Sequence, residues 1–181
     1  MKLPRRALLL APLLALSGET QAQPKPLVVP LSWYVVQVED NAFTVEMPGV
    51  PDHRVLGDRS ARGTPFALHS YSLDAGGFAY VAQTALYPGD VDVSQPRAIL
   101  QVALNDRAQQ LETRKWSRVD WRQVPRATAA VESIGPVRGG EALRQLIALQ
   151  GRRFVSIALL GNAAGLNANE GERFFKSLKL A

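Results

Sequence analysis

The residues best suited to ligand chemistry lie between Thr113 and Arg126, in the segment TRKWSRVDWRQVPR. Arginine recurs there at every fourth position, a spacing that places the arginines on one side of either a strand or a helix. Guanidinium groups next to indole rings bind carboxylates, phosphates or sugar acids through paired hydrogen bonds and stacking. The segment therefore predicts a binding surface made of Arg114, Trp116, Arg118, Trp121, Arg122 and Arg126.

A structural role also explains the same segment. The arginines would form a basic, solvated outer face, partly neutralised by Asp120, while Trp116 and Trp121 would close one edge of a core. Both interpretations stay open on the sequence alone.

The two histidines, His53 and His69, give little indication of a catalytic role. His69 precedes Ser70, but adjacent residues of a strand point to opposite faces, so the two cannot form a dyad. The chain has no Gly-x-Ser-x-Gly motif. We therefore expect ordinary surface or edge histidines, no catalytic residue and no enzyme activity.

The segment from Asp90 to Ser94 resembles the start of a calcium loop, with oxygen-bearing side chains at alternate positions. The sixth position of such a loop requires Gly and the twelfth requires Glu, but this chain has Gln95 and Gln101 there. Its paired glycines occur outside any phosphate-binding pattern and mark turns. The sequence predicts no metal site and no cofactor.

The first 22 residues have the layout of a signal peptide. Lys2, Arg5 and Arg6 precede an apolar run that is much shorter than the roughly 20 residues of a membrane-spanning helix, and small and polar residues lead to a cleavage site after Ala22. The general export pathway is the default, with Arg5-Arg6 leaving a twin-arginine signal as the alternative. We expect an exported, periplasmic protein with no transmembrane segment after cleavage.

Composition limits the partners that such a protein would have. The chain has no Cys, and therefore no residue for a lipoprotein anchor, a disulfide or a thiolate metal site. Loss of residues 1–22 leaves 18 basic and 15 acidic residues, a net charge of +3. This small excess, together with export, argues against a nucleic-acid partner, although arginine and tryptophan also occur in nucleic-acid platforms.

The remaining chain divides into an extended proline-rich tether, residues 23–31, and one α+β domain, residues 32–181. We expect an antiparallel sheet of about six to eight strands, one long central helix from Pro96 to Glu112 capped by Ser94, and a short C-terminal helix capped by Asn167 or Asn169. Residues 51–65 are expected to form an exposed loop or edge piece. The expected strands are Trp33–Glu39, Phe43–Met47, Phe66–Leu73, Phe78–Leu86, Trp116–Arg122, Ala127–Ile134, Ala142–Leu149 and Phe154–Leu160, with a last short strand at Leu178–Leu180.

Several of these segments together resemble a family of small exported bacterial domains with a PsbP/Mog1-like fold. The resemblance rests on the opening FTVEMPGVP, the hairpin leading to FAYVAQTALYP, the long helix, the strand VPRATAAVE, the hairpin LRQLIALQGRRFVSIALLG and the ending ERFFKSLKL. It implies an antiparallel sheet flanked by helices and a role as an accessory subunit or partner-binding module. The chain departs from the family at Pro125-Arg126, where a glycine is expected after the proline.

Two functions follow from the sequence. The first is a non-enzymatic exported binding or accessory module that contacts a protein partner in the envelope. The alternative is a periplasmic carrier or sensor of a small anionic or apolar ligand held between sheet and helix.

Overall fold

The computed structural model describes residues 32–111, 115–137 and 139–181. The predicted signal peptide, the predicted tether and Arg114 of the predicted binding surface lie outside the described residues. Among the helices formed by the described residues, none has the length and apolar character needed to cross a membrane.

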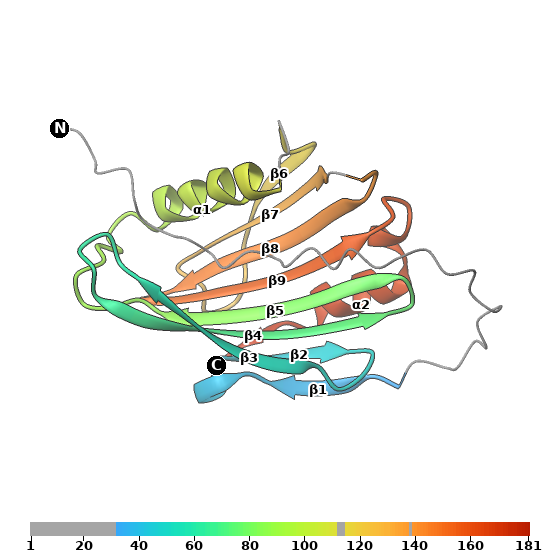
Figure 1. The fold of residues 1–181 in the computed structure, drawn as a ribbon, viewed down its shortest axis with the longest axis horizontal. Helices are drawn as coiled ribbons and strands as arrows, with labels where there is room; N and C mark the ends of the chain where they lie inside the picture. The colour runs from blue at the N-terminus through green and yellow to red at the C-terminus, as the bar shows by residue number, and fades with distance from the viewer. Residues whose placement is uncertain (1–31, 112–114, 138) are drawn as a thin grey trace.

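Seven antiparallel strands form a large sheet in the order β3-β4-β5-β9-β8-β7-β6 (Figure 1). Most neighbours in this order are also neighbours along the chain, and β5 with β9 is the exception. Gly76 and Gly77 turn β4 into β5 with φ angles of 60° and 80°, which glycine adopts without steric cost. The strands are β3 (Asp52–Arg59), β4 (Pro65–Ala75), β5 (Phe78–Leu86), β6 (Arg118–Arg122), β7 (Ala129–Pro136), β8 (Ala142–Gln150) and β9 (Arg153–Gly161).

A second, smaller sheet joins the beginning and the end of the described chain. Strand β2 (Phe43–Met47) pairs on one side with β1 (Tyr34–Gln37) and on the other with β10 (Lys179–Leu180). The short 3-10 helix η1 (Glu39–Asn41) connects β1 with β2. Pro48 follows β2 and cannot donate a hydrogen bond to a strand ladder, which ends the strand there.

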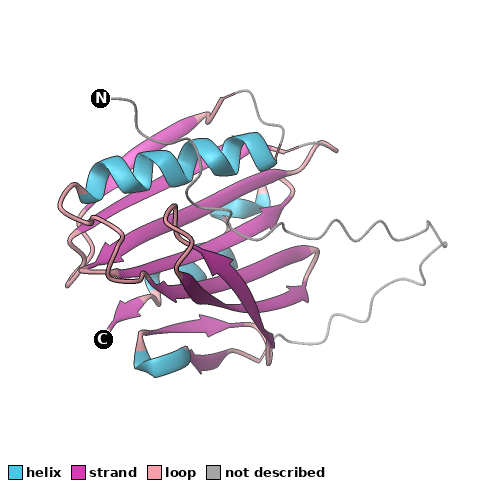
Figure 2. Ribbon diagram, turned by 60° about the vertical axis from the view of Figure 1, so that its left-hand side comes forward, coloured by secondary structure: helices cyan, strands magenta, loops and turns pink. Residues whose placement is uncertain are grey.

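The two α-helices lie on opposite faces of the large sheet (Figures 1 and 2). Helix α1 (Pro96–Gln110) packs Leu100 and Leu104 in one core cluster with Ile147 of β8. Helix α2 (Asn169–Lys176) packs its phenylalanines in another cluster with Leu146, the neighbouring residue of β8. Because successive side chains of a strand point to opposite faces, the sheet is covered by α1 on one face and by α2 with the small sheet on the other.

The α+β class and the antiparallel pairing are confirmed, whereas strand number and helix length differ from the expectation. The described residues form ten strands in two sheets, and not six to eight in one. Segment 51–65 adds β3 as an edge strand, and β1, β2 and β10 separate into their own sheet. The helix expected to be long comprises 15 residues, Pro96–Gln110.

The predicted helix caps are also wrong. Gln95 precedes α1 and Ala168 precedes α2, and neither makes a side-chain capping bond. Helix α1 depends less on a cap because Pro96 at its start has no N–H to satisfy. In α2 the 3-10 turn η2 (Gly165–Asn167) runs directly into the helix, and Asn167 uses its side chain elsewhere.

Candidate binding site

Strand β6 directs two of the predicted arginines toward the face of the large sheet that α2 covers. Arg118 lies opposite Ile134 and Arg122 opposite Ala130 on the neighbouring strand β7. Glu132 of β7 lies between these two positions and points to the same face, because it is two residues from each in a strand of period two. The arginine spacing in the sequence therefore brings both guanidinium groups to one buried carboxylate.

The two predicted tryptophans lie on the other face of the sheet, next to α1. Trp116 donates from Nε1 to the carbonyl oxygen of Leu104, 3.2 Å away, and packs against the α1 side of the core. Trp121 is 39% exposed, and the guanidinium of Arg97 lies 5.2 Å from its ring centroid. Arginines and tryptophans thus do not form one mixed stripe, since the sheet separates them.

Glu132 is the centre of the polar cluster on the α2 face, although only 4% of it is exposed. Its carboxylate accepts from Nε of Arg144 at 2.7 Å and from Nε of Arg122 at 2.9 Å. Arg118 lies 3.6 Å from the same carboxylate through Nη2. Three arginines therefore surround one buried anion, an arrangement that offsets the desolvation of the carboxylate.

Arg144 of β8 connects this carboxylate to α2, and it is itself only 4% exposed. Its Nη1 lies 2.6 Å from the Glu172 carboxylate, 3.2 Å from Oδ1 of Asn167 and 3.3 Å from the carbonyl oxygen of Leu166. Its guanidinium also lies over the ring of Phe175, 4.2 Å from the centroid. Each of these contacts fixes the guanidinium in one orientation.

Glu172 closes the cluster at α2. The hydrogen bond from Arg144, more than any other contact, holds the pKa of Glu172 below its usual value. Lys176 adds a second cation, 3.2 Å from the other carboxylate oxygen of Glu172. The carboxylate is therefore held in its charged form.

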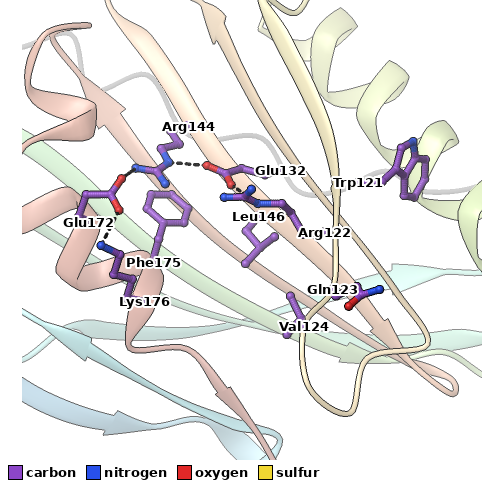
Figure 3. A pocket seen from close by; sticks show the side chains of 10 residues that line it. All are labelled: Trp121, Arg122, Gln123, Val124, Glu132, Arg144, Leu146, Glu172, Phe175 and Lys176. Carbon is purple, nitrogen blue, oxygen red and sulfur yellow. Dashed lines mark hydrogen bonds and ion pairs between the residues drawn. The ribbon is translucent and has the colours of Figure 1, made fainter.

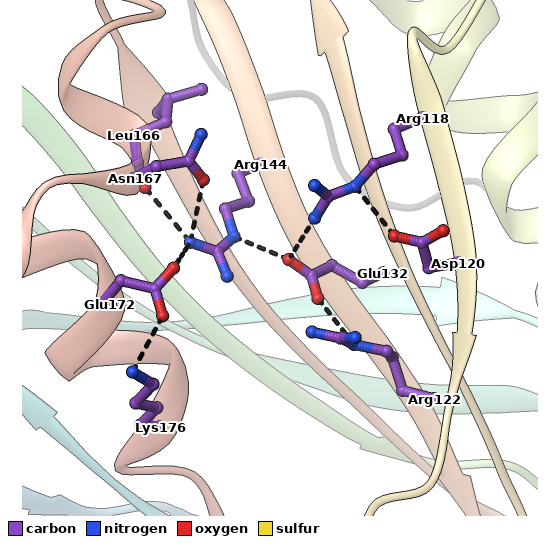
Figure 4. A network of polar contacts seen from close by, with 9 residues as sticks. All are labelled: Arg118, Asp120, Arg122, Glu132, Arg144, Leu166, Asn167, Glu172 and Lys176. Carbon is purple, nitrogen blue, oxygen red and sulfur yellow. Dashed lines mark hydrogen bonds and ion pairs between the residues drawn. The ribbon is translucent and has the colours of Figure 1, made fainter.

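We call this set of side chains the Glu132 network (Figure 4). Asp120 belongs to it through an ion pair with Nε of Arg118 at 2.8 Å. The network contains four cations and three anions, which leaves one positive charge uncompensated within it. Its charged members are Arg118, Asp120, Arg122, Glu132, Arg144, Glu172 and Lys176.

A groove of about 390 Å³ opens over the network, between β6 and α2 (Figure 3). A second hollow of about 520 Å³ adjoins it beyond the end of β6, with Trp121, Arg122, Gln123 and Val124 shared between the two. We refer to the first as the β6–α2 groove. It is lined by Trp121, Arg122, Gln123, Val124, Glu132, Arg144, Leu146, Glu172, Phe175 and Lys176.

The last predicted arginine, Arg126, is not part of the network. It is exposed in the turn between β6 and β7, with φ at 68° in the left-handed region. Glycine adopts this conformation more easily than arginine does, and this is the position where the family pattern leads us to expect glycine. The turn therefore keeps its shape without that glycine.

Sequence reasoning missed the residues that β7, β8 and α2 contribute to the groove. Glu132 and Arg144 do leave a signal, because each is a charge inside an otherwise apolar strand, in AAVESI and ALRQLIAL. A charge at such a position is rarely buried without a partner. Glu172, Phe175 and Lys176 gave no comparable signal, since a short amphipathic helix accounts for them.

The remaining residues considered for catalysis or metal binding in the sequence, His69-Ser70 and the segment from Asp90 to Ser94, make local contacts in the structure. His69 and Ser70 are consecutive residues of β4, so their side chains point to opposite faces. Ser60 donates to Asp90 at 2.5 Å, and the backbone N–H of Ser94 donates to Asp92 at 2.9 Å. Both aspartates thus stabilise turns before α1. The Ser60 bond is the main reason that the pKa of Asp90 lies below its usual value.

Comparison with known proteins does not assign the chain to a family. No protein-family model matches the chain, and a search of curated proteins found no match.

Proposed function

We propose that the protein is an exported, non-enzymatic binding module whose β6–α2 groove binds an extended acidic segment of a protein partner in the envelope. The observation that carries the proposal is the surplus of positive charge at the groove. Arg118, Arg122 and Arg144 all lie against the single carboxylate of Glu132. A ligand carboxylate would add the missing negative charge.

The cations are available to a ligand as well as to the network. The side chain of Arg122 is 50% exposed and that of Lys176 is 77% exposed. Arg122 contacts Glu132 through Nε, at the base of the guanidinium, and its side chain remains half exposed. Guanidinium groups held by one carboxylate are already oriented for a second, which lowers the entropy cost of binding.

An extended segment can lie along the β6 side of the groove, because β6 is an edge strand. No other described strand follows it in the order of the large sheet, so its outer N–H and C=O groups can pair with an added strand. Side chains of such a segment would alternate between the Glu132 network and the exposed face of Trp121. Val124, Leu146 and Phe175 supply apolar surface in the groove.

The absence of enzyme activity forms part of the proposal. The residues that line the groove include no serine, cysteine or histidine, the side chains used most often as nucleophiles or bases. Its two carboxylates are held in ion pairs with arginine. For Glu172 the depressed pKa favours a permanent charge over proton transfer.

Export and the finer fold assignment are supported by sequence features alone. Residues 1–22 have the layout of a signal peptide, which places the protein in the periplasm under this proposal. The order of elements resembles PsbP/Mog1-type domains, many of which act as accessory subunits. This fold-level likeness favours a binding role without identifying a partner.

The proposal can be tested with defined probes on the purified protein. We would titrate it with an oligo-glutamate peptide, an oligo-lysine peptide and succinate, and follow backbone amide signals by NMR. We expect the acidic peptide to shift signals of β6 and α2, and the affinity to fall at high salt. Arg122→Ser should weaken binding by about tenfold or more, whereas Arg62→Ser, on a distant exposed turn, should not.

Each other outcome has a defined meaning. Binding of succinate without binding of the peptide would replace the proposal with the alternative function, a carrier or sensor of small anions. Equal losses in Arg122→Ser and Arg62→Ser would indicate attraction by net charge alone. No binding of either anion would overturn the groove as an anion site.

A further inference from the structure

The only two histidines of the chain, His53 and His69, lie next to each other on the large sheet. They are diagonal neighbours on the paired strands β3 and β4, where His53 lies opposite Tyr71 and Val55 lies opposite His69. Nε2 of His53 is 3.3 Å from Nδ1 of His69. The ring centroids are 5.5 Å apart and the ring planes are inclined by 13°.

A carboxylate from the other sheet completes the cluster. Glu39 of η1 places Oε2 3.8 Å from Nδ1 of His69. All three donor atoms lie within 4.8 Å of one another. Three residues that are distant in sequence thus place two imidazole nitrogens and one carboxylate oxygen around one point.

Tyr71 contacts two of the three residues, the backbone of Glu39 and the ring of His53. Its hydroxyl accepts from the backbone N–H of Glu39 at 3.1 Å, which holds η1 against β4. Its ring stacks on His53 at a centroid distance of 4.3 Å and an angle of 11°. These contacts hold the His53 ring and the backbone of Glu39 in place at the cluster.

We propose that Glu39, His53 and His69 bind one divalent first-row transition-metal ion, with Zn²⁺ as the reference ion. Donor atoms around tetrahedral Zn²⁺, each about 2.0 Å from the metal, lie about 3.3 Å apart. The distance between the histidine nitrogens already has this value. The Glu39 oxygen needs only a small movement, and its side chain is 45% exposed and can rotate.

The donor set determines the class of ion. Two imidazoles with one carboxylate suit Zn²⁺, Cu²⁺ or Ni²⁺, whereas Ca²⁺ and Mg²⁺ prefer oxygen donors only. Three protein ligands leave a fourth position for water or for a donor from a second molecule. A bound ion would tie η1, in the connection between β1 and β2, to the free edge of the large sheet.

The test uses Zn²⁺ alone with the purified protein, by isothermal titration and thermal unfolding. We expect one ion per chain and a rise in Tm on adding Zn²⁺. His53→Asn or His69→Asn should weaken binding by about 100-fold, and Glu39→Gln by about tenfold. Asp74→Asn, the loss of an exposed carboxylate on the same strand β4, is the matched control and should bind as the parent does.

A measurement without variants guards against unfolding of the mutants. The histidine ring signals in NMR spectra of the parent protein should both shift on adding Zn²⁺, and Mg²⁺ should shift neither. Absence of these shifts, or unchanged Zn²⁺ affinity in both histidine variants, would overturn the proposal and leave a simple hydrogen bond between the two rings.

Discussion

At the scale of single residues, Glu132 and Arg144 depend on each other. Both are almost fully buried, and they are joined by a hydrogen bond of 2.7 Å between Nε and the carboxylate. A buried charge that loses its partner is costly, whereas replacing both members of a pair by apolar groups often costs little. The network should therefore respond very differently to single and double substitutions.

We predict that Arg144→Leu lowers the free energy of unfolding by about 3 kcal/mol, because Glu132 then keeps only the two half-exposed arginines of β6. The double variant Glu132→Leu/Arg144→Leu should lose much less than the sum of the two single variants. Urea unfolding followed by circular dichroism would measure both. Additive losses would contradict the coupling, as would an Arg144→Leu protein as stable as the parent.

The sequence shows part of this site at the level of residue types. Arg118 and Arg122 could be recognised by their spacing, and their common face follows from the period of a strand. Their partner could not be recognised, because the pairing of Asp120 with Glu132 depends on the register between β6 and β7. The histidine cluster stayed hidden for the same reason, since register brings His53 and His69 together.

At the scale of elements, α2 is attached to the large sheet by both apolar and ionic contacts. Phe174 and Phe175 pack into the core beneath the helix. The ion pair between Glu172 and Arg144, at 2.6 Å, ties the helix to β8. Because one of these attachments carries ionisable groups, the docking of α2 depends on pH.

We predict that stability falls as the pH drops below about 4.5, the ordinary pKa of Glu172. The pKa of Glu172 is lower in the folded protein, so near this pH the folded state binds fewer protons than the unfolded state does. The stabilisation from the ionised Glu172 is therefore fully present above the unfolded pKa. It is lost as the pH falls through the lower, folded pKa.

Urea unfolding at a series of pH values would measure this loss. Glu172→Gln should reduce the slope of stability against pH, whereas Glu170→Gln, which removes a carboxylate of the same helix outside the network, should change it less. Equal slopes in Glu172→Gln and the parent would contradict the assignment.

The predicted bounds match the structure for elements with strong local sequence signals. They do not match for elements that depend on partners distant in the sequence. Strands β2 and β5 begin and end at the predicted residues, because alternation and flanking turns define them. The sequence does not distinguish a loop from an edge piece at β3, and the residues of this strand are mostly exposed in the structure. The cap expected for α2 at Asn167 is wrong because the side chain of Asn167 accepts from Arg144.

At the scale of the whole molecule, the small sheet holds the first and last described strands together. Leu180 of β10 lies opposite Phe43 of β2, and both are buried in the same core cluster. The backbone N–H of Ala181 also donates to the carbonyl oxygen of Ala42, 3.1 Å away. The small sheet thus depends on a very short strand at the C-terminus.

We predict that Leu180→Ala lowers the free energy of unfolding by about 2–3 kcal/mol, because it leaves a cavity between the two sheets. Lys179→Ala, on the same strand but exposed, is the control and should cost well under half as much. Thermal unfolding would measure both, and hydrogen exchange should show faster exchange in β1 and β2 of Leu180→Ala. Unchanged exchange there would mean that the hairpin holds its place without β10.

The division into two sheets could not be predicted, because it depends on pairings between distant segments. Sequence patterns define hairpins, but β2 with β10 and β5 with β9 are joined only in the folded chain. The hairpin-linked strands of the sequence indicate the α+β class, but not this arrangement.

The pairing of β5 with β9 joins two parts of the large sheet that are separate along the chain. Strands β3 to β5 form one run of hairpins and β6 to β9 another, so each can assemble from neighbouring residues. The seam, where Leu86 meets Arg153, requires closure of the long intervening chain. Pairing between strands that are far apart in the sequence is slower than hairpin formation, because the entropy cost of closing the loop comes before the contacts that repay it. We therefore expect the pairing of β5 with β9 to form late in folding, and until it forms the two strands expose unpaired edges that a chaperone could cover.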